Sequence, residues 1–283
     1  MTQRLIVPVD GSPASWSAVD IAITLAERLS ARVHVVEVAF APADVRAAQA
    51  RLEDGAADHR QRNASIDVEV RLSGDSVASA VEELVLANPG SVVVMASNGR
   101  GRSAALVGSV AEDILHRIFG PIILVGPEVG KRGFDGPVVV SVDGSDESEA
   151  ALPLAAAWAI ELGVAPWIVH VADPKHRIAP GSDIVESVYP ARLAQELTTL
   201  SHHDVQFEEL HDAHPGSAVP DFADKLNASL IVAASHGRTG MRRLTMGSVT
   251  SEFVRHSTCP VLVVRLPLPA ANHDDPGTTR VTT

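Results

Sequence analysis

Apolar and polar residues alternate in blocks along the chain, and the blocks predict strands that alternate with helices. In the first half, five short runs are predicted to be strands, and the apolar, β-branched run at residues 4–9 has the pattern of a buried strand. They span residues 4–9, 33–38, 66–72, 92–96 and 121–125. Between them, apolar residues recur at helical spacing, most clearly after Ser12-Pro13, a helix cap followed by a first helical residue. Alternating strands and helices predict a parallel sheet with right-handed crossovers.

The second half repeats this pattern in the same order. Its apolar runs span residues 138–142, 164–171, 205–210, 230–234 and 260–264. The turn Asp10-Gly11-Ser12 recurs as Asp143-Gly144-Ser145 after the corresponding run. We therefore interpret the chain as an internal duplication, with domains at 1–126 and 137–265 and a Gly- and charge-rich linker at 127–136. Residues 266–283 lack periodicity and are predicted to be a disordered tail.

Each half contains a Gly-rich loop between its fourth apolar run and the helix that follows. The two stretches are residues 92–110 and 231–249. Glycine lets backbone amides come close to a phosphate, and the unpaired amides of a helix N-terminus favour an anion. Neither stretch has an acidic residue, and both loops carry arginines, namely Arg100, Arg102, Arg238, Arg242 and Arg243. The sequence thus predicts two phosphate-binding loops.

The predicted topology brings other polar positions to the same edge as these loops. In open parallel sheets, ligands bind at the carboxyl ends of the strands, at a topological switch point. Asp10 and Val38 end the first and second strands of the first half, and Asp143 and Val171 do so in the second half. A candidate ligand site therefore lies at this edge of each domain.

Composition narrows the class of protein. The 283 residues are 46% hydrophobic and 20% charged, typical of a globular chain. The net charge of −12 disfavours nucleic acid as a partner. No apolar run is long enough to span a membrane, and the single cysteine cannot form an intramolecular disulfide. These features predict a cytoplasmic protein with neither a membrane nor a nucleic-acid partner.

With both Asp-Gly-Ser turns and both Gly loops in view, the chain resembles the universal stress protein family in its tandem form. The family's nucleotide signature is Gly, two residues, Gly, nine residues, Gly and then Ser or Thr. It maps onto Ala234, Gly237 and Gly247-Ser248, and onto Ala96, Gly99 and Gly108-Ser109 with one residue fewer in the loop. Alanine replaces the first glycine in both repeats, which requires a negative φ there. Because the second loop keeps the full spacing, the sequence favours the second site.

The resemblance implies an α/β fold of two tandem flavodoxin-like domains, each a five-stranded parallel sheet flanked by helices. It implies ATP as the ligand, which Mg²⁺ can accompany, and no dedicated metal site. The binding residues that it implies in the first domain are Pro8, Val9, Asp10, Val38, Ala96, Ser97, Asn98, Gly99, Arg102, Gly108, Ser109 and Val110. Those in the second domain are Ser141, Val142, Asp143, Val171, Ala234, Ser235, His236, Gly237, Arg238, Arg242, Gly247, Ser248 and Val249.

Structural explanations compete with these assignments. Ser109 and Glu112 have the spacing of a capping box, and Asp10 and Asp143 suit Asx turns.

The leading hypothesis is a nucleotide-binding regulatory protein in stress response. A metabolic enzyme is less favoured, because the GxxxxGK[ST] motif of the usual phosphoryl-transfer enzymes is absent from the sequence. The alternatives are a slow ATPase, with His236 as its candidate catalytic residue, and a nucleotide-free interaction scaffold. The two fifth strands are expected to pair with each other or to form a homodimer.

Overall fold

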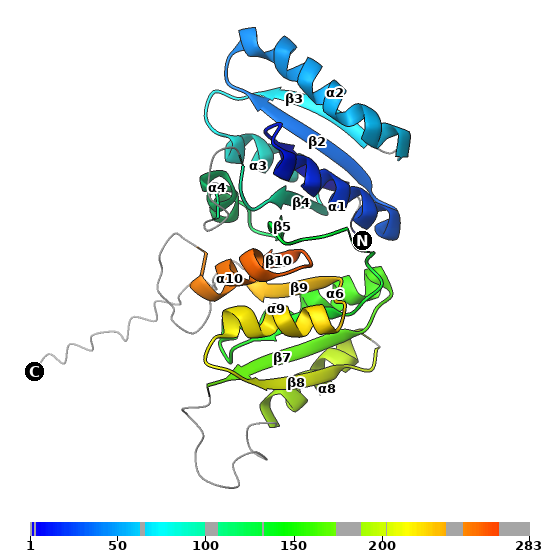
Figure 1. The fold of residues 1–283 in the computed structure, drawn as a ribbon, viewed down its shortest axis with the longest axis vertical. Helices are drawn as coiled ribbons and strands as arrows, with labels where there is room; N and C mark the ends of the chain where they lie inside the picture. Colours follow the sequence, from blue (N-terminus) through cyan, green and yellow to red (C-terminus); the bar gives the residue numbers. More distant parts are fainter. Residues whose placement is uncertain are drawn as a thin grey trace, which may run out of the picture.

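The strands of both repeats form one ten-stranded sheet in the computed structural model (Figure 1). The structure describes residues 2, 4–62, 66–99, 107–131, 133–173, 188–201, 203–235 and 246–265. The strand order is β3-β2-β1-β4-β5-β10-β9-β6-β7-β8. Pairing is parallel within each repeat and antiparallel between β5 and β10. The predicted α/β fold with two parallel five-stranded halves is confirmed.

The first repeat contains the five predicted strands and the helices between them. Its elements are β1 (Arg4–Val9), α1 (Pro13–Leu29), β2 (Arg32–Ala39), a 3₁₀ turn (Pro42–Asp44), α2 (Val45–Arg62), β3 (Ile66–Leu72), α3 (Val77–Ala87), β4 (Ser91–Ala96), α4 (Ser109–Arg117) and β5 (Pro121–Val125). Helix α1 begins as the sequence predicts, because the side chain of Ser12 accepts a hydrogen bond from the amide of Ser15 and Pro13 is the first helical residue.

The second repeat follows the same order with a divided first helix. Its elements are β6 (Val138–Val142), α5 (Asp146–Glu149), α6 (Leu152–Leu162), β7 (Pro166–Ala172), α8 (Val188–Ser201), β8 (Gln206–His211), α9 (Pro215–Lys225), β9 (Leu230–Ala234), α10 (Ser248–His256) and β10 (Val261–Val264). A proline at the second position of α6 stands just after this division.

Two apolar layers cover the faces of the sheet, and each layer runs through both repeats. One layer packs α1, α2, α6 and α8 against side chains such as Val7 and Val140. The other packs α3, α4, α9 and α10 against side chains such as Ile6 and Val139. Because successive side chains of a strand point to opposite faces, the continuous apolar runs of the sequence serve both layers.

The junction between the repeats is made by the two fifth strands. Strand β10 runs antiparallel to β5, with Leu262 opposite Ile123. The intramolecular pairing that the sequence left open against a homodimer is therefore present. Arg265 extends the junction, because its guanidinium donates to the carbonyl oxygens of Leu115 and His116 at the end of α4 and lies 4.7 Å from the ring centroid of Phe119.

The corresponding residue of the first repeat, Gly126, lies against the opposite helix end. A Cβ atom on Gly126 would come within 1.8 Å of the carbonyl oxygen of Val254 in α10. The backbone at this position therefore packs directly on the helix, whereas in the second repeat the side chain of Arg265 reaches the helix end. Within the described part of the chain, no helix is long and apolar enough to cross a membrane.

Candidate functional site

A crevice opens between β1 and β4, where the strand order of the first repeat reverses. The parallel pairing of the two strands extends from Arg4 opposite Ser91 to Ile6 opposite Val93. Both strands continue beyond it, to Val9 and Ala96, without pairing to each other. The strands therefore diverge at their carboxyl ends, at the switch point where ligands of doubly wound sheets bind.

A pocket occupies this crevice. Its volume is about 230 Å³, which is below the ~300–1,000 Å³ of pockets that enclose a whole small ligand. A nucleotide held here would therefore extend beyond its mouth. The pocket is lined by Pro8, Val9, Asp10, Ser15, Val77, Met95, Ala96, Ser97, Asn98, Gly99, Gly108, Ser109, Val110 and Ala111.

Asp10 is the first residue after β1 and begins the turn that leads to α1. Its Oδ1 accepts a hydrogen bond of 2.9 Å from the amide of Ser12, so the predicted Asx turn is present. Gly11 makes the turn possible, because its φ of 78° lies in the left-handed region. The second carboxylate oxygen faces the Gly loop, since a Cβ atom on Gly99 would lie 2.7 Å from Oδ2. The Asp10 carboxylate thus lies between its own turn and the loop.

Two backbone hydrogen bonds fix the ends of the Gly loop. The amide of Ser97 donates to the carbonyl of Val125 at 2.9 Å, and the amide of Gly108 donates to the carbonyl of Ser97 at 2.7 Å. Ala96 is the last residue of β4, and the non-glycine residues with positive φ in the described chain are Ser30 and Asn227. Alanine therefore meets the negative-φ requirement at the first glycine position of the signature.

The predicted capping box of Ser109 and Glu112 is wrong. The N-cap of α4 is Gly108, whose carbonyl accepts from the amide of Glu112, and no side chain caps the helix. Ser109 is the first helical residue and is exposed. By contrast, Ser12 and Ser76 cap α1 and α3 with their hydroxyls. The first amides of α4 thus lack a side-chain acceptor from an N-cap residue, which suits a helix start that receives an anion.

The second repeat reproduces the backbone of this site. The amide of Ser235 donates to the carbonyl of Val264, and that of Gly247 donates to the carbonyl of Ser235, both at 2.9 Å. Gly247 is the N-cap of α10, again without a side-chain cap. Asp143 forms the same Asx turn, with 3.0 Å between its Oδ1 and the amide of Ser145.

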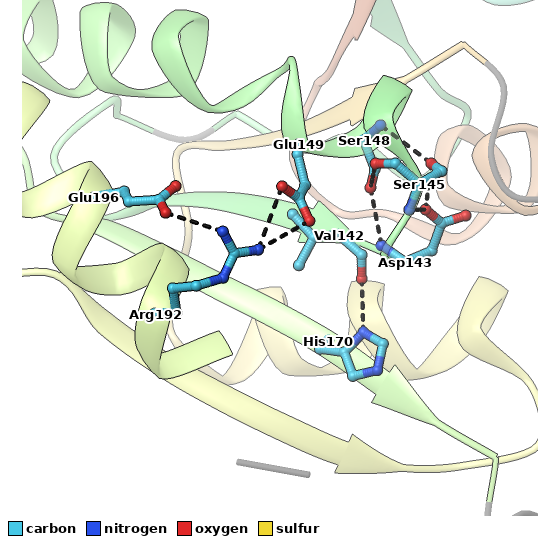
Figure 2. A network of polar contacts seen from close by, with 8 residues as sticks. All are labelled: Val142, Asp143, Ser145, Ser148, Glu149, His170, Arg192 and Glu196. Atoms are coloured by element: carbon cyan, nitrogen blue, oxygen red, sulfur yellow. Dashed lines mark hydrogen bonds and ion pairs between the residues drawn. The ribbon is translucent and has the colours of Figure 1, made fainter. Parts of the chain in front are cut away.

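Figure 2 shows the side chains around Asp143, and they differ from those around Asp10. The hydroxyl of Ser145 also donates to Asp143 Oδ1, at 2.6 Å. Glu149 stands where the first repeat has Trp16 and accepts hydrogen bonds from Arg192, which also binds Glu196. In the first repeat, Trp16 stacks on the ring of His59 instead, with the ring centroids 5.4 Å apart.

An aromatic pair adjoins this network in the second repeat. His170 Nδ1 donates to the carbonyl oxygen of Val142 at 3.0 Å, and its ring meets the ring of Tyr189 edge-on at 5.2 Å. The hydroxyl oxygen of Tyr189 is buried. Burial raises the pKa of Tyr189, and the nearby carboxylates of Glu149 and Asp143 raise it further. Tyr189 is therefore a neutral phenol at physiological pH.

The structure brings together most of the residues predicted for the first site. Val38 is half-buried and stands one residue before the end of β2, but it does not line the pocket, and Val171 is half-buried in β7. Ser248 and Val249 begin α10, and Ser141 and Val142 end β6. Five predicted residues lie outside the described residues, namely Arg102, His236, Gly237, Arg238 and Arg242.

Four lining residues escaped the sequence prediction: Ser15, Val77, Met95 and Ala111. Val77 begins α3, and every helix that follows a strand of a parallel sheet starts at the carboxyl edge, so topology alone indicated it. Ser15 and Ala111 lie in the first turns of α1 and α4 and have no motif of their own. Within the described ranges, no group of three His, Cys, Asp or Glu side chains could hold a metal ion.

The fold and the crevice define an α/β protein of the doubly wound class with two tandem units. The model of the "Universal stress protein family" matches residues 1–126 and 136–265. The chain belongs to this family.

One relative from this family matches nearly the whole chain, and another matches about two thirds of it. The universal stress protein Rv1996 of Mycobacterium tuberculosis is 28% identical over 303 aligned residues, covering 93% of this chain and 95% of the relative. Rv2005c of the same organism is 31% identical, and its match spans 64% of this chain and 63% of that protein. A universal stress protein structure from Archaeoglobus fulgidus has a TM-score of 0.68 at 21% identity, covering 93% of this chain and 98% of that one. This likeness shows the shared fold.

Proposed function

We propose that this chain is an ATP-binding universal stress protein, in which bound nucleotide regulates the protein in stress response. The pocket between β1 and β4 carries the proposal, because ten of the twelve residues that the family resemblance implies for the first domain line it. Adenine and ribose would lie toward Val38 and Asp10, and the phosphates toward the Gly loop and the start of α4. The proposal assigns binding and no catalytic residue.

Regulation follows from binding alone. A ligand that binds only the folded state stabilises it by about 2.7 kcal/mol at a concentration of 100 times its Kd. It also shifts any equilibrium between conformations that differ in affinity for it. Because the pocket joins β1, β4 and the starts of α1, α3 and α4, nucleotide would tie together segments from the whole first repeat.

The first test is the nucleotide content of the protein. Protein purified from cells is denatured and the supernatant is separated by chromatography, with ATP expected as the released compound. Nucleotide-free protein is then titrated with ATP in a calorimeter, with and without Mg²⁺. Absence of released nucleotide together with absence of uptake would favour the scaffold alternative instead.

A pair of charge substitutions tests the place of binding. Val110 and Val249 begin α4 and α10 and are 40% and 37% exposed. Val110→Glu together with Val249→Glu puts a carboxylate at each proposed phosphate site and is expected to abolish uptake by repulsion. Leu86→Glu is the control, because Leu86 lies in α3, is 74% exposed and does not line the pocket. Equal uptake by the double variant and the control would contradict the proposed site.

A further inference from the structure

The two repeats share a backbone arrangement, but the side chains beside their Asp-Gly-Ser turns have different chemistry. Resting on the proposed function, we propose that the first repeat alone binds nucleotide, and that Tyr189 and an acidic helix start close the second site. The chain would then bind one nucleotide rather than two.

The first argument is steric. In the binding mode proposed for the first repeat, adenine lies between Asp10 and Val38, toward the end of β2. In the second repeat, Tyr189 at the start of α8 stands on the corresponding side of the turn, because its ring meets the ring of His170 in β7 edge-on at 5.2 Å. Its hydroxyl lies beside the backbone of Gly144 and the carboxylate of Glu149. The hydroxyl is buried, so this place is filled by protein. Helix α2 of the first repeat has no Phe, Trp or Tyr that could do the same.

The second argument is the charge of the helix start. The first turn of α5 carries three acidic residues, Asp146, Glu147 and Glu149, directly after Asp143. The first turn of α1 carries none, because Pro13, Ala14 and Trp16 stand at the same places. A polyphosphate approaching Asp143 would therefore meet the charge of three further carboxylates in the helix turn that follows, and like charges repel.

The third argument concerns a cation on that side, Arg192, within the part of the chain that the structure describes. Arg192 is the basic residue of α8, and its guanidinium lies 3.0 Å from Glu196 and 3.3 Å from Glu149 (Figure 2). Two carboxylates thus already neutralise it, and a phosphate would have to displace them. Asp143 itself accepts hydrogen bonds from both the amide and the hydroxyl of Ser145. Asp143 and Arg192 are thus already engaged with other side chains of this site.

Binding stoichiometry and labelling of the unaltered protein test this proposal. Calorimetric titration with ATP is expected to give one nucleotide per chain. Photolabelling with 8-azido-ATP, followed by mass spectrometry of peptides, is expected to mark residues within 1–126. Two nucleotides per chain, or labelled peptides from 137–265, would overturn the inference while leaving the proposed function intact. No uptake at all would instead refute the proposed function.

Variants separate the contributions of the two repeats. Val110→Glu alone is expected to remove all uptake, and a remaining site would overturn the inference. In that background, Tyr189→Ala is expected to restore uptake at the second repeat, more weakly than in the wild type because the acidic residues of α5 remain. Continued absence of uptake by a variant with unchanged circular dichroism would show that Tyr189 does not close the site.

Discussion

The hydrogen bonds of His34 require a neutral imidazole. Arg4 can only donate, so His34 Nδ1, 3.3 Å from Arg4 Nη1, must accept. The proton is then on Nε2, which lies 2.9 Å from the carboxylate of Glu69. Burial lowers the pKa of His34, with Arg4 adding to the effect and Glu69 opposing it. Geometry and solvation thus agree on the neutral form.

A dependence of stability on pH follows for His34. Because the pKa is lower in the folded than in the unfolded state, the unfolded chain binds more protons between the two values. The free energy of unfolding is therefore expected to fall as pH drops below about 6.5, by at most about 1.4 kcal/mol per pH unit from this residue. Urea titrations of the wild type and of His34→Gln from pH 7.5 to 5 measure it. Identical slopes for the two proteins would contradict the prediction.

Gly99 is the loop residue whose size matters most for Asp10. An added Cβ would lie 2.7 Å from Asp10 Oδ2, so Gly99→Ala must displace the carboxylate. We expect ATP affinity to fall about tenfold, a loss of about 1.4 kcal/mol, while the fold is kept. Gly74→Ala is the matched control, since a Cβ there meets nothing within 4 Å. Calorimetric titration of both variants decides, and equal affinities would exclude this role of Gly99.

At the residue scale, the sequence predicted positions better than contacts. Asp10, Gly99 and Gly108 could be found because a turn, a glycine and a helix start each leave a local pattern. The contact of Glu149 with Arg192 could not, because the two residues are far apart in the chain and α8 has no motif. The preference of the sequence for the second site depended on loop spacing alone. The proposed single site lies in the first repeat and so reverses this preference. The reason is that side chains outside the Gly loop determine the space and the charge beside each Asp-Gly-Ser turn.

At the scale of elements, helix ends line the pocket and form part of the junction between the repeats. Helices α1, α3 and α5 begin at serine side-chain caps, whereas α4 and α10 begin at Gly108 and Gly247 without one. The C-terminal end of α4 receives Arg265, whose positive charge complements the negative end of the helix dipole. One helix therefore contributes its N-terminus to the pocket and its C-terminus to the contact between repeats.

Removing the side chain of Arg265 tests that contact. Arg265→Ala loses charge-assisted hydrogen bonds to two carbonyls and the cation–π contact with Phe119. We expect a loss of about 1–2 kcal/mol in the free energy of unfolding. Arg265→Lys should recover part of it, since the charge remains. Urea denaturation midpoints measure the difference, and an unchanged midpoint in the alanine variant would show that the contact contributes nothing.

For whole elements, the sequence predicted most strands because they are short apolar runs, and it predicted the largely polar β8 because the second half repeats the order of the first. The sequence did not decide which strand pairs with each fifth strand. Strands β5 and β10 have similar apolar sequences, so no local feature distinguishes pairing within one chain from pairing between two chains. The sequence also missed the division between α5 and α6, since a helical pattern crosses Ala150 without an obvious break.

At the scale of the whole molecule, the antiparallel β5–β10 ladder turns two edges into the centre of one sheet. The outer edges are β3 and β8. We expect backbone amides of β5 and β10 to exchange with deuterium as slowly as those of β1 and β6, because they are buried and paired on both sides. Mass spectrometry of peptides from the full chain measures the rates, with β3 and β8 as internal references. Exchange of β5 as fast as that of β3 would show that the two repeats separate in solution.

The covalent union of the two halves removes a constraint that a pair of identical subunits must obey. In a homodimer, every substitution appears twice, on both sides of the twofold axis. Here Gly126 and Arg265 can differ at matching places, as can Trp16 and Glu149, because at the β5–β10 junction each half meets the other half rather than a copy of itself. One half can therefore change in sequence while the other keeps its own residues, and the two halves do not dissociate when the protein is diluted.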